Sequence, residues 1–76
     1  MNLSQLNPGQ RASILGFRQL SAEVRKRLMI MGILPETPVL LIRKAPMGDP
    51  LQVEVRGVSL AIREKIAAAI EVEIIG

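Results

Sequence analysis

The chain has 76 residues, 49% of them hydrophobic, and ten basic against seven acidic side chains give it a net charge of +3. A chain of this length buries only about 60% of the surface that it exposes when unfolded, so we expect one domain, residues 1–76, with a small core. The absence of cysteine, of an apolar run long enough to span a bilayer and of a signal-peptide pattern predicts a cytoplasmic protein that is not itself in the membrane.

The first half of the chain predicts one strand and one helix. Residues 10–17 follow an Asn-Pro-Gly turn and are β-prone. Ser21 is suited to cap the helix that comes next. Val24, Leu28 and Met31 then recur at the i, i+4 and i+7 spacing of a buried helical stripe. We therefore expect this helix to pack on the core through these three side chains.

The end of this helix carries its own signal. Gly32 suits the position just after the helix, where it would let Ile33 pack back on Leu28 in a Schellman motif. Met29 and Ile30 lie off the apolar stripe, on opposite sides of it. Either the core extends around the helix at this point, or both side chains are exposed.

The second half of the chain predicts four short strands. Residues 39–45 are apolar on both faces at first, whereas residues 51–56, 58–62 and 70–75 alternate between apolar and polar side chains. Residues 63–70 suit a short helix or a single helical turn. Five short strands without a repeated βαβ order predict a mainly β fold with one or two short helices, a small β-barrel with the main helix inserted after the first strand.

The same alternation predicts which side chains form the core. We expect the apolar positions of the last three strands to point inward together with the helical stripe. Glu71 and Glu73 then point outward from the last strand. The predicted core residues are Val24, Leu28, Val53, Val55, Leu60, Ile62, Val72 and Ile74.

The chain offers few residues for catalysis or for metal binding. It has no His and no Cys, which removes the usual general base, thiol nucleophile and transition-metal ligands. Its glycines form no phosphate-binding loop. Glu71 and Glu73 could hold a hard cation weakly, but an outward-facing strand edge explains them better. We therefore expect a protein that is not an enzyme, with no catalytic site and no cofactor.

Nucleic-acid binding is also disfavoured. Residues 25–27, Arg-Lys-Arg, form the only basic triplet, and a solvated helix face explains it better than a phosphate-reading surface. Phe17 is the only aromatic residue, so the stacking platforms that single-strand binders use are missing. A small RNA-binding barrel would reveal itself by an affinity that falls steeply with salt.

Residues 45–50, Ala-Pro-Met-Gly-Asp-Pro, form an irregular tip between two predicted strands. A simple hairpin would need only Asn-Gly or Asp-Gly at this place. One interpretation is structural: Gly48 and Asp49 build a turn, and Pro50 starts a strand where no backbone donor is needed. The other is functional: a rigid loop presents Met47 to a partner with little entropy to lose. The residues alone leave both open.

Five pieces of sequence carry a family resemblance. In chain order they are RLMIMGILP at 27–35, APMGDP at 45–50, VEVRG at 53–57, LAIR at 60–63 and IEVE at 70–73. With these pieces the chain resembles, over about residues 11–75, the FeoA family, the small cytoplasmic component of bacterial ferrous iron uptake. One departure concerns Pro35-Glu36, where the family commonly has Pro-Gly. Because Glu36 does not easily adopt a positive φ, we expect a type I turn there in place of type II.

The resemblance implies a fold, a role and a partner. The fold is an SH3-like β-barrel in a stand-alone domain, and the role is a non-enzymatic one in ferrous iron transport. The implied partner is the membrane transporter FeoB, whose cytoplasmic part is a GTP-binding domain. Whether the contact stimulates GTP hydrolysis, gates the pore or only assembles the complex stays open, as does the oligomeric state.

The alternative is a divalent-metal-responsive regulatory SH3-like domain, since the family is often catalogued with transition metal ion binding. Any metal in this chain would rest on Asp49, on glutamates or on backbone oxygens. Such ligands would hold ferrous iron weakly and with poor selectivity.

We predict a partner-binding surface from the residues that these patterns leave over. Exposed apolar side chains mark an interaction site when they cluster, and the flexible thioether of methionine adapts to a partner. We expect Met29, Ile30 and Met47 to form one contiguous apolar patch, with the rest of the tip fixing the loop beside it. The predicted site residues are Met29, Ile30, Met47, Gly48, Asp49 and Pro50.

Overall fold

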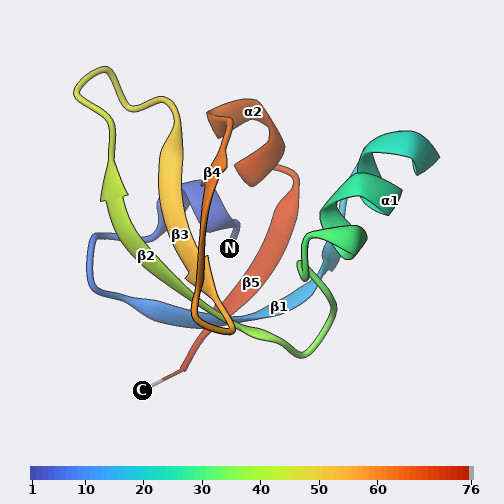
Figure 1. The fold of residues 1–76 in the computed structure, drawn as a ribbon, viewed down its shortest axis with the longest axis horizontal. Coiled ribbons are helices and arrows are strands. Elements are labelled where there is room, and N and C mark those ends of the chain that lie inside the picture. The colour runs from blue at the N-terminus through green and yellow to red at the C-terminus, as the bar shows by residue number, and fades with distance from the viewer. Residues whose placement is uncertain (76) are drawn as a thin grey trace.

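A computed structural model describes residues 1–75 and shows a curved five-stranded antiparallel sheet with two short α-helices (Figure 1). The elements in chain order are the 3₁₀-helix η1 (Leu3–Gln5), β1 (Arg11–Phe17), α1 (Ala22–Ile30), β2 (Pro38–Lys44), β3 (Leu51–Val55), β4 (Val58–Ile62), α2 (Glu64–Ala67) and β5 (Ile70–Ile74). The predicted mainly β fold, with its main helix inserted after the first strand, is confirmed. None of the helices in residues 1–75 has the length and the hydropathy needed to cross a membrane.

The strands pair in the order β4–β3–β2–β1–β5, so β4 and β5 form the two edges and the sheet is not closed into a barrel. The β3–β4 hairpin is in regular register from Leu51 opposite Ile62 to Val55 opposite Val58. The β1–β5 pairing shifts register between Ile14 and Gly16, as a β-bulge does. Helix α1 lies beside the sheet, at the end of β1 (Figure 1).

Most of the predicted core is buried, with one error. Leu28, Val53, Val55, Ile62 and Val72 are buried, as predicted. Two further predicted residues, Val24 and Leu60, are partly buried and pack against this core.

Ile74 is the error, because its side chain is 47% exposed. It lies opposite Ala12 at the end of the edge strand β5, beyond the part of the strand that the core covers. Two side chains ahead of β1 contribute instead: Leu3 and Leu6, at and after η1, are fully buried.

The turn before β2 differs from the prediction. Glu36 has a φ of 62°, and the Thr37 N–H donates to the Leu34 carbonyl at 3.3 Å. A positive φ at the third position is what a type II turn requires, so the expected type I turn is wrong. The reason is tertiary: the Glu36 N–H donates to the carbonyl of Ile14 in β1 at 2.6 Å. The Ile14 N–H donates in turn to the Thr37 carbonyl at 3.0 Å, so two hydrogen bonds to β1 hold the turn in this conformation.

We expect Glu36→Gly to stabilise the protein. The left-handed conformation costs a residue with a Cβ atom about 1–2 kcal/mol, and the greater freedom of glycine in the unfolded chain offsets part of the gain. A net gain of about 1 kcal/mol would raise Tm by roughly 4–8 °C in a chain of this size. Thermal unfolding followed by circular dichroism measures it. Glu36→Ala keeps the Cβ atom and should bring no such gain; a Gly variant that melts no higher than the Ala variant would contradict the prediction.

Candidate functional site

Helix α1 is fixed at both ends by the local signals that the sequence carries. The Oγ atom of Ser21 accepts a hydrogen bond from the Val24 N–H at 3.2 Å. At the other end Gly32 has a φ of 98°, and the Ile33 N–H donates to the Leu28 carbonyl at 2.9 Å. These are the hydrogen-bonded cap and the Schellman motif that were predicted.

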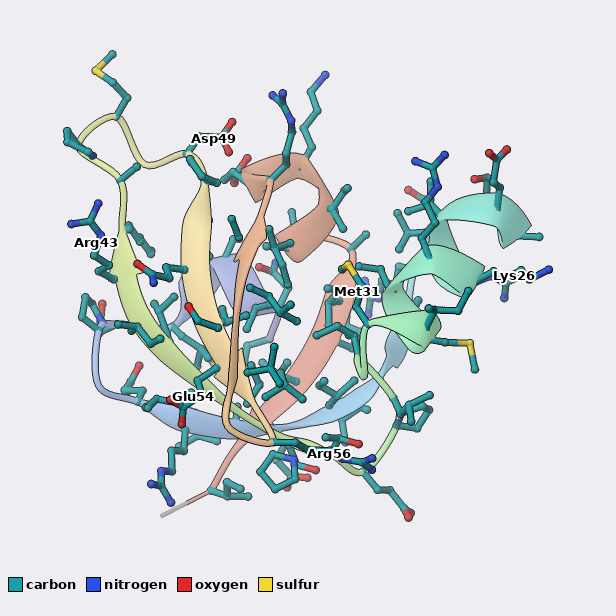
Figure 2. All side chains as sticks on the ribbon, viewed as in Figure 1. Lys26, Met31, Arg43, Asp49, Glu54 and Arg56 are labelled. Atoms are coloured by element: carbon teal, nitrogen blue, oxygen red, sulfur yellow. The ribbon has the colours of Figure 1, made fainter. Side chains whose placement is uncertain are left out.

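The helix contacts the core through a small part of its surface. Leu28 is its only buried residue, and Val24 packs partly against the core. Met31, predicted to complete this stripe, is 42% exposed, so that prediction is wrong. The helix ends at Ile30 and Met31 is its C-cap, on the side that faces the sheet, whereas Lys26 points away from the sheet (Figure 2). Much of α1 is therefore free to meet a partner.

An open groove of about 580 Å³ follows α1. Met29 and Ile30 both line it and are 44% and 76% exposed, so the second of the two alternatives for these residues is the correct one. The residues from α1 lie at the i, i+3, i+4, i+7 and i+8 spacing of one helix face, apart from the Val24–Leu28 stripe. The groove is lined by Phe17, Ala22, Arg25, Lys26, Met29, Ile30 and Pro35.

Sequence reasoning missed part of this groove. Phe17 ends β1 and Pro35 precedes β2, and only the tertiary fold brings them to α1. A sequence signal for Phe17 existed, since aromatic residues are enriched at interfaces and Phe17 is the only one in the chain. Arg25 and Lys26, for which the sequence predicts a solvated helix face, are both exposed, and both line the groove.

The tip between β2 and β3 is a turn closed by backbone hydrogen bonds. The Gly48 N–H donates to the Ala45 carbonyl at 2.7 Å, and the Ala45 N–H donates to the Pro50 carbonyl at 3.0 Å. Gly48 has a φ of 83°, which a residue with a Cβ atom rarely adopts. Met47 is 93% exposed at the apex. The structural and the functional interpretation of the tip are therefore compatible.

Asp49 has a structural contact of its own. Its Oδ1 atom accepts a hydrogen bond at 3.0 Å from the backbone N–H of Glu64, the first residue of α2. Arg63, the residue at the N-cap position, provides no side-chain hydrogen bond. Asp49 therefore caps α2 from the loop between β2 and β3, and Figure 2 shows it close to the start of that helix.

We expect Asp49→Ala to lower the free energy of unfolding by about 0.5–2 kcal/mol, the usual cost of removing a helix cap. Urea unfolding followed by circular dichroism measures the change. Asp49→Asn keeps an oxygen acceptor at this place and should lose less. If the Ala variant were as stable as the original chain, the hydrogen bond to Glu64 would not be a stabilising cap.

The structure does not bring the two predicted surfaces together. The tip and α1 lie on opposite sides of the molecule (Figure 1), and Met47 is not among the residues that line the groove. The expected contiguous patch of Met29, Ile30 and Met47 is therefore wrong. The reason is topological: α1 follows β1, whereas the tip extends from the far end of the β2–β3 hairpin. Binding of a partner at either surface stays a prediction.

The described side chains do not form a dedicated metal site. Within residues 1–75 no group of three or more His, Cys, Asp or Glu side chains is placed to hold a metal ion. Glu71 forms an ion pair with Arg18 and lies 3.8 Å from the N-terminal ammonium group of Met1. Since the chain also lacks His and Cys, it has none of the nitrogen and sulfur ligands that zinc prefers.

Comparison with known proteins points to one family. The FeoA domain family model matches residues 1–74. The solution structure of a FeoA protein from Chlorobium tepidum is similar with a TM-score of 0.94 and 36% identity, over 100% of this chain and 71% of that one. FeoA from Stenotrophomonas maltophilia, solved in complex with zinc and described as an SH3 domain protein, is similar with a TM-score of 0.82 and 29% identity, over 96% of this chain and 89% of that one. The predicted SH3-like fold is thereby confirmed.

A further relative is much longer than this chain. It is the Fe(2+) transport protein A/Fe(2+) transporter FeoB fusion protein of Porphyromonas gingivalis, 32% identical over 75 residues. The match covers 99% of this chain and 9% of the fusion protein. The chain therefore spans about a tenth of the length of that relative, and the rest of the relative has no counterpart in it.

Proposed function

This chain belongs to the FeoA family, and from that premise we propose that it is an accessory protein of ferrous iron uptake that acts by contact with the transporter FeoB. The observation that carries the proposal is the fusion protein of Porphyromonas gingivalis, in which a segment similar to this chain shares one polypeptide with a FeoB transporter. Linking two modules raises their effective concentration for each other, so such a fusion supports a functional contact between the two modules. The same contact is proposed for separate chains.

The proposed action is non-enzymatic and takes place at the cytoplasmic part of the transporter. The groove and the tip offer apolar side chains for contact. The sequence has no His and no Cys, so it lacks the usual general base and thiol nucleophile. A protein of this kind would act by changing the conformation or the assembly of its partner. Stimulated GTP hydrolysis, gating of the pore and assembly of the complex are three forms that this action could take.

The groove along α1 is the better candidate for the docking surface. The tip presents one large apolar side chain, Met47, whereas the groove gathers several, among them Phe17, Met29 and Ile30. Clustered apolar side chains mark an interaction site more strongly than a single one. Asp49, beside Met47, is moreover engaged in capping α2.

The proposal is tested by the capture of a defined partner together with a transport assay. The tagged protein is used to capture FeoB from detergent-solubilised membranes of the native, iron-starved cells, and FeoB is identified by mass spectrometry. In parallel, uptake of radioactive ferrous iron is measured in a strain that lacks this protein and in the complemented strain. We expect FeoB to be enriched and the lost uptake to be restored. Normal uptake in the strain without the protein would contradict the proposal.

A direct measurement distinguishes the alternative, a divalent-metal-responsive regulatory domain, from a protein that acts by contact with FeoB. Anaerobic isothermal titration with Fe²⁺ or Mn²⁺ would show tight stoichiometric binding if the protein were a metal sensor. The available carboxylates predict weak binding at most. Tight binding of one ion per chain would favour the alternative over contact with FeoB as the primary function.

A further inference from the structure

The groove along α1 combines apolar side chains with an unbalanced positive charge. Arg25 and Lys26 line it, and no acidic residue does. Among the ion pairs within residues 1–75, neither Arg25 nor Lys26 takes part, whereas the neighbouring Arg27 lies 3.6 Å from Glu23. The two cations of the groove therefore lack a counter-charge in the described part of the protein, and the third cation of the triplet has one.

Along α1 the charged and the apolar side chains of the groove are one helical turn apart on the same face. Arg25 precedes Met29 by four residues, and Lys26 precedes Ile30 by four, so each cation lies one turn from an apolar neighbour on the same face. Phe17 and Pro35 complete the apolar lining from outside the helix. A ligand that lies along α1 would thus meet apolar surface and positive charge at the same time.

We propose that this groove binds an acidic amphipathic helix of a partner protein. Apolar side chains of that helix, at the i, i+3 or i+4 and i+7 spacing, contact Phe17, Met29 and Ile30, and its Asp or Glu side chains pair with Arg25 and Lys26. The inference rests on the proposed function and deepens it, because it states the chemistry of the segment through which the transporter docks. The flexible side chain of Met29, which lines the groove, lets the surface adapt to that segment.

Other occupants fit the groove less well. A nucleic acid would leave its apolar side chains without a counterpart, and one aromatic residue gives little surface for base stacking. An anionic lipid surface would meet the two cations but would not follow a recess beside the helix. An apolar peptide without acidic residues would leave both cations unpaired at the edge of the contact.

Two synthetic peptides test the inference directly. The first is a helical peptide with leucines on one face and glutamates on the other, and the second carries lysine in place of every glutamate. Each is titrated into the isotope-labelled full chain, and binding is followed by the shifts of backbone amide and methionine methyl signals. We expect the glutamate peptide to shift signals of Phe17, Ala22 and Met29, and the lysine peptide to bind about tenfold more weakly. Added salt should reduce that difference, because it screens exposed charges.

Charge reversal distinguishes this charge-dependent binding from non-specific hydrophobic binding. The double variant Arg25→Glu/Lys26→Glu should prefer the lysine peptide over the glutamate peptide. Arg27→Glu/Arg63→Glu is the matched control, because it makes the same change in net charge at two exposed residues that do not line the groove; it should keep the original preference. Circular dichroism of each variant shows that α1 is retained.

Several results would overturn the inference. These are equal affinity for the two peptides, shifts confined to the tip around Met47, or binding only to vesicles of phosphatidylcholine and phosphatidylglycerol. Its failure can be told apart from that of the proposed function. If the protein captures FeoB and restores uptake but the glutamate peptide does not bind to its groove, only this inference fails. If the groove binds the peptide in the predicted way but uptake is normal without the protein, only the proposed function fails.

Discussion

Leu28→Ala should lower the free energy of unfolding by about 2–5 kcal/mol, the largest loss of stability that we expect from a single substitution in α1. Leu28 is the one buried residue of this helix, and its carbonyl accepts the hydrogen bond of Ile33 that closes the Schellman motif. Truncation would leave a cavity at the place where the helix is attached. A small domain has only about 5–15 kcal/mol of stability in total, so the melting temperature should fall steeply. Thermal and urea unfolding followed by circular dichroism measure the loss.

Two further variants keep this prediction testable if the Ala variant does not fold. Ile30→Ala removes an apolar side chain from the same helix, but that side chain is 76% exposed, so stability should change by no more than about 0.5 kcal/mol. Leu28→Met conserves most of the volume and should cost less than about 1.5 kcal/mol. A folded Leu28→Ala protein with an unchanged melting temperature would show that α1 is not held by this side chain.

Met29→Glu should abolish the contribution of the protein to ferrous iron uptake while the fold stays intact. Met29 is 44% exposed and lines the groove, so a charge there can reach water in the free protein. In a complex the same charge would be buried against the apolar face of the partner. Burying an unpaired charge in an apolar contact costs about 2 kcal/mol or more, which is roughly a 30-fold loss of affinity. Uptake of radioactive ferrous iron in a complemented deletion strain, with Tm of the purified variant, tests both parts.

The control for this variant is Ile74→Glu, which places the same charge at an exposed isoleucine of similar accessibility on the edge strand β5, outside the groove. Its uptake should match that of the original chain. Met47→Glu tests the tip in the same assay. Loss of uptake in Met47→Glu with normal uptake in Met29→Glu would place the docking surface at the tip and would contradict our choice of the groove.

Local signals in the sequence were sufficient for the secondary structure and for part of the core. Ser21 caps α1 and Gly32 ends it, because side-chain oxygens and positive φ angles act on the backbone within a few residues. The alternation of Val53 and Val55 with polar neighbours reported the buried face of β3, because successive side chains of a strand point to opposite sides. The same pattern failed at Ile74, since periodicity does not show where an edge strand passes beyond the core.

Only the tertiary structure decided which of these elements meet. Glu36 has a positive φ because two hydrogen bonds join its turn to Ile14, a residue more than twenty positions away, and they outweigh its local preference. The strand order β4–β3–β2–β1–β5 likewise places the tip that carries Met47 and the helix that carries Met29 on opposite sides of the molecule. The position of Met29 off the buried stripe allowed its exposure but did not decide it. The neighbours of Met29 in the groove could not be predicted from the sequence. Contacts between distant segments depend on strand pairing and on the packing of the whole chain, and a local sequence pattern carries no information about them.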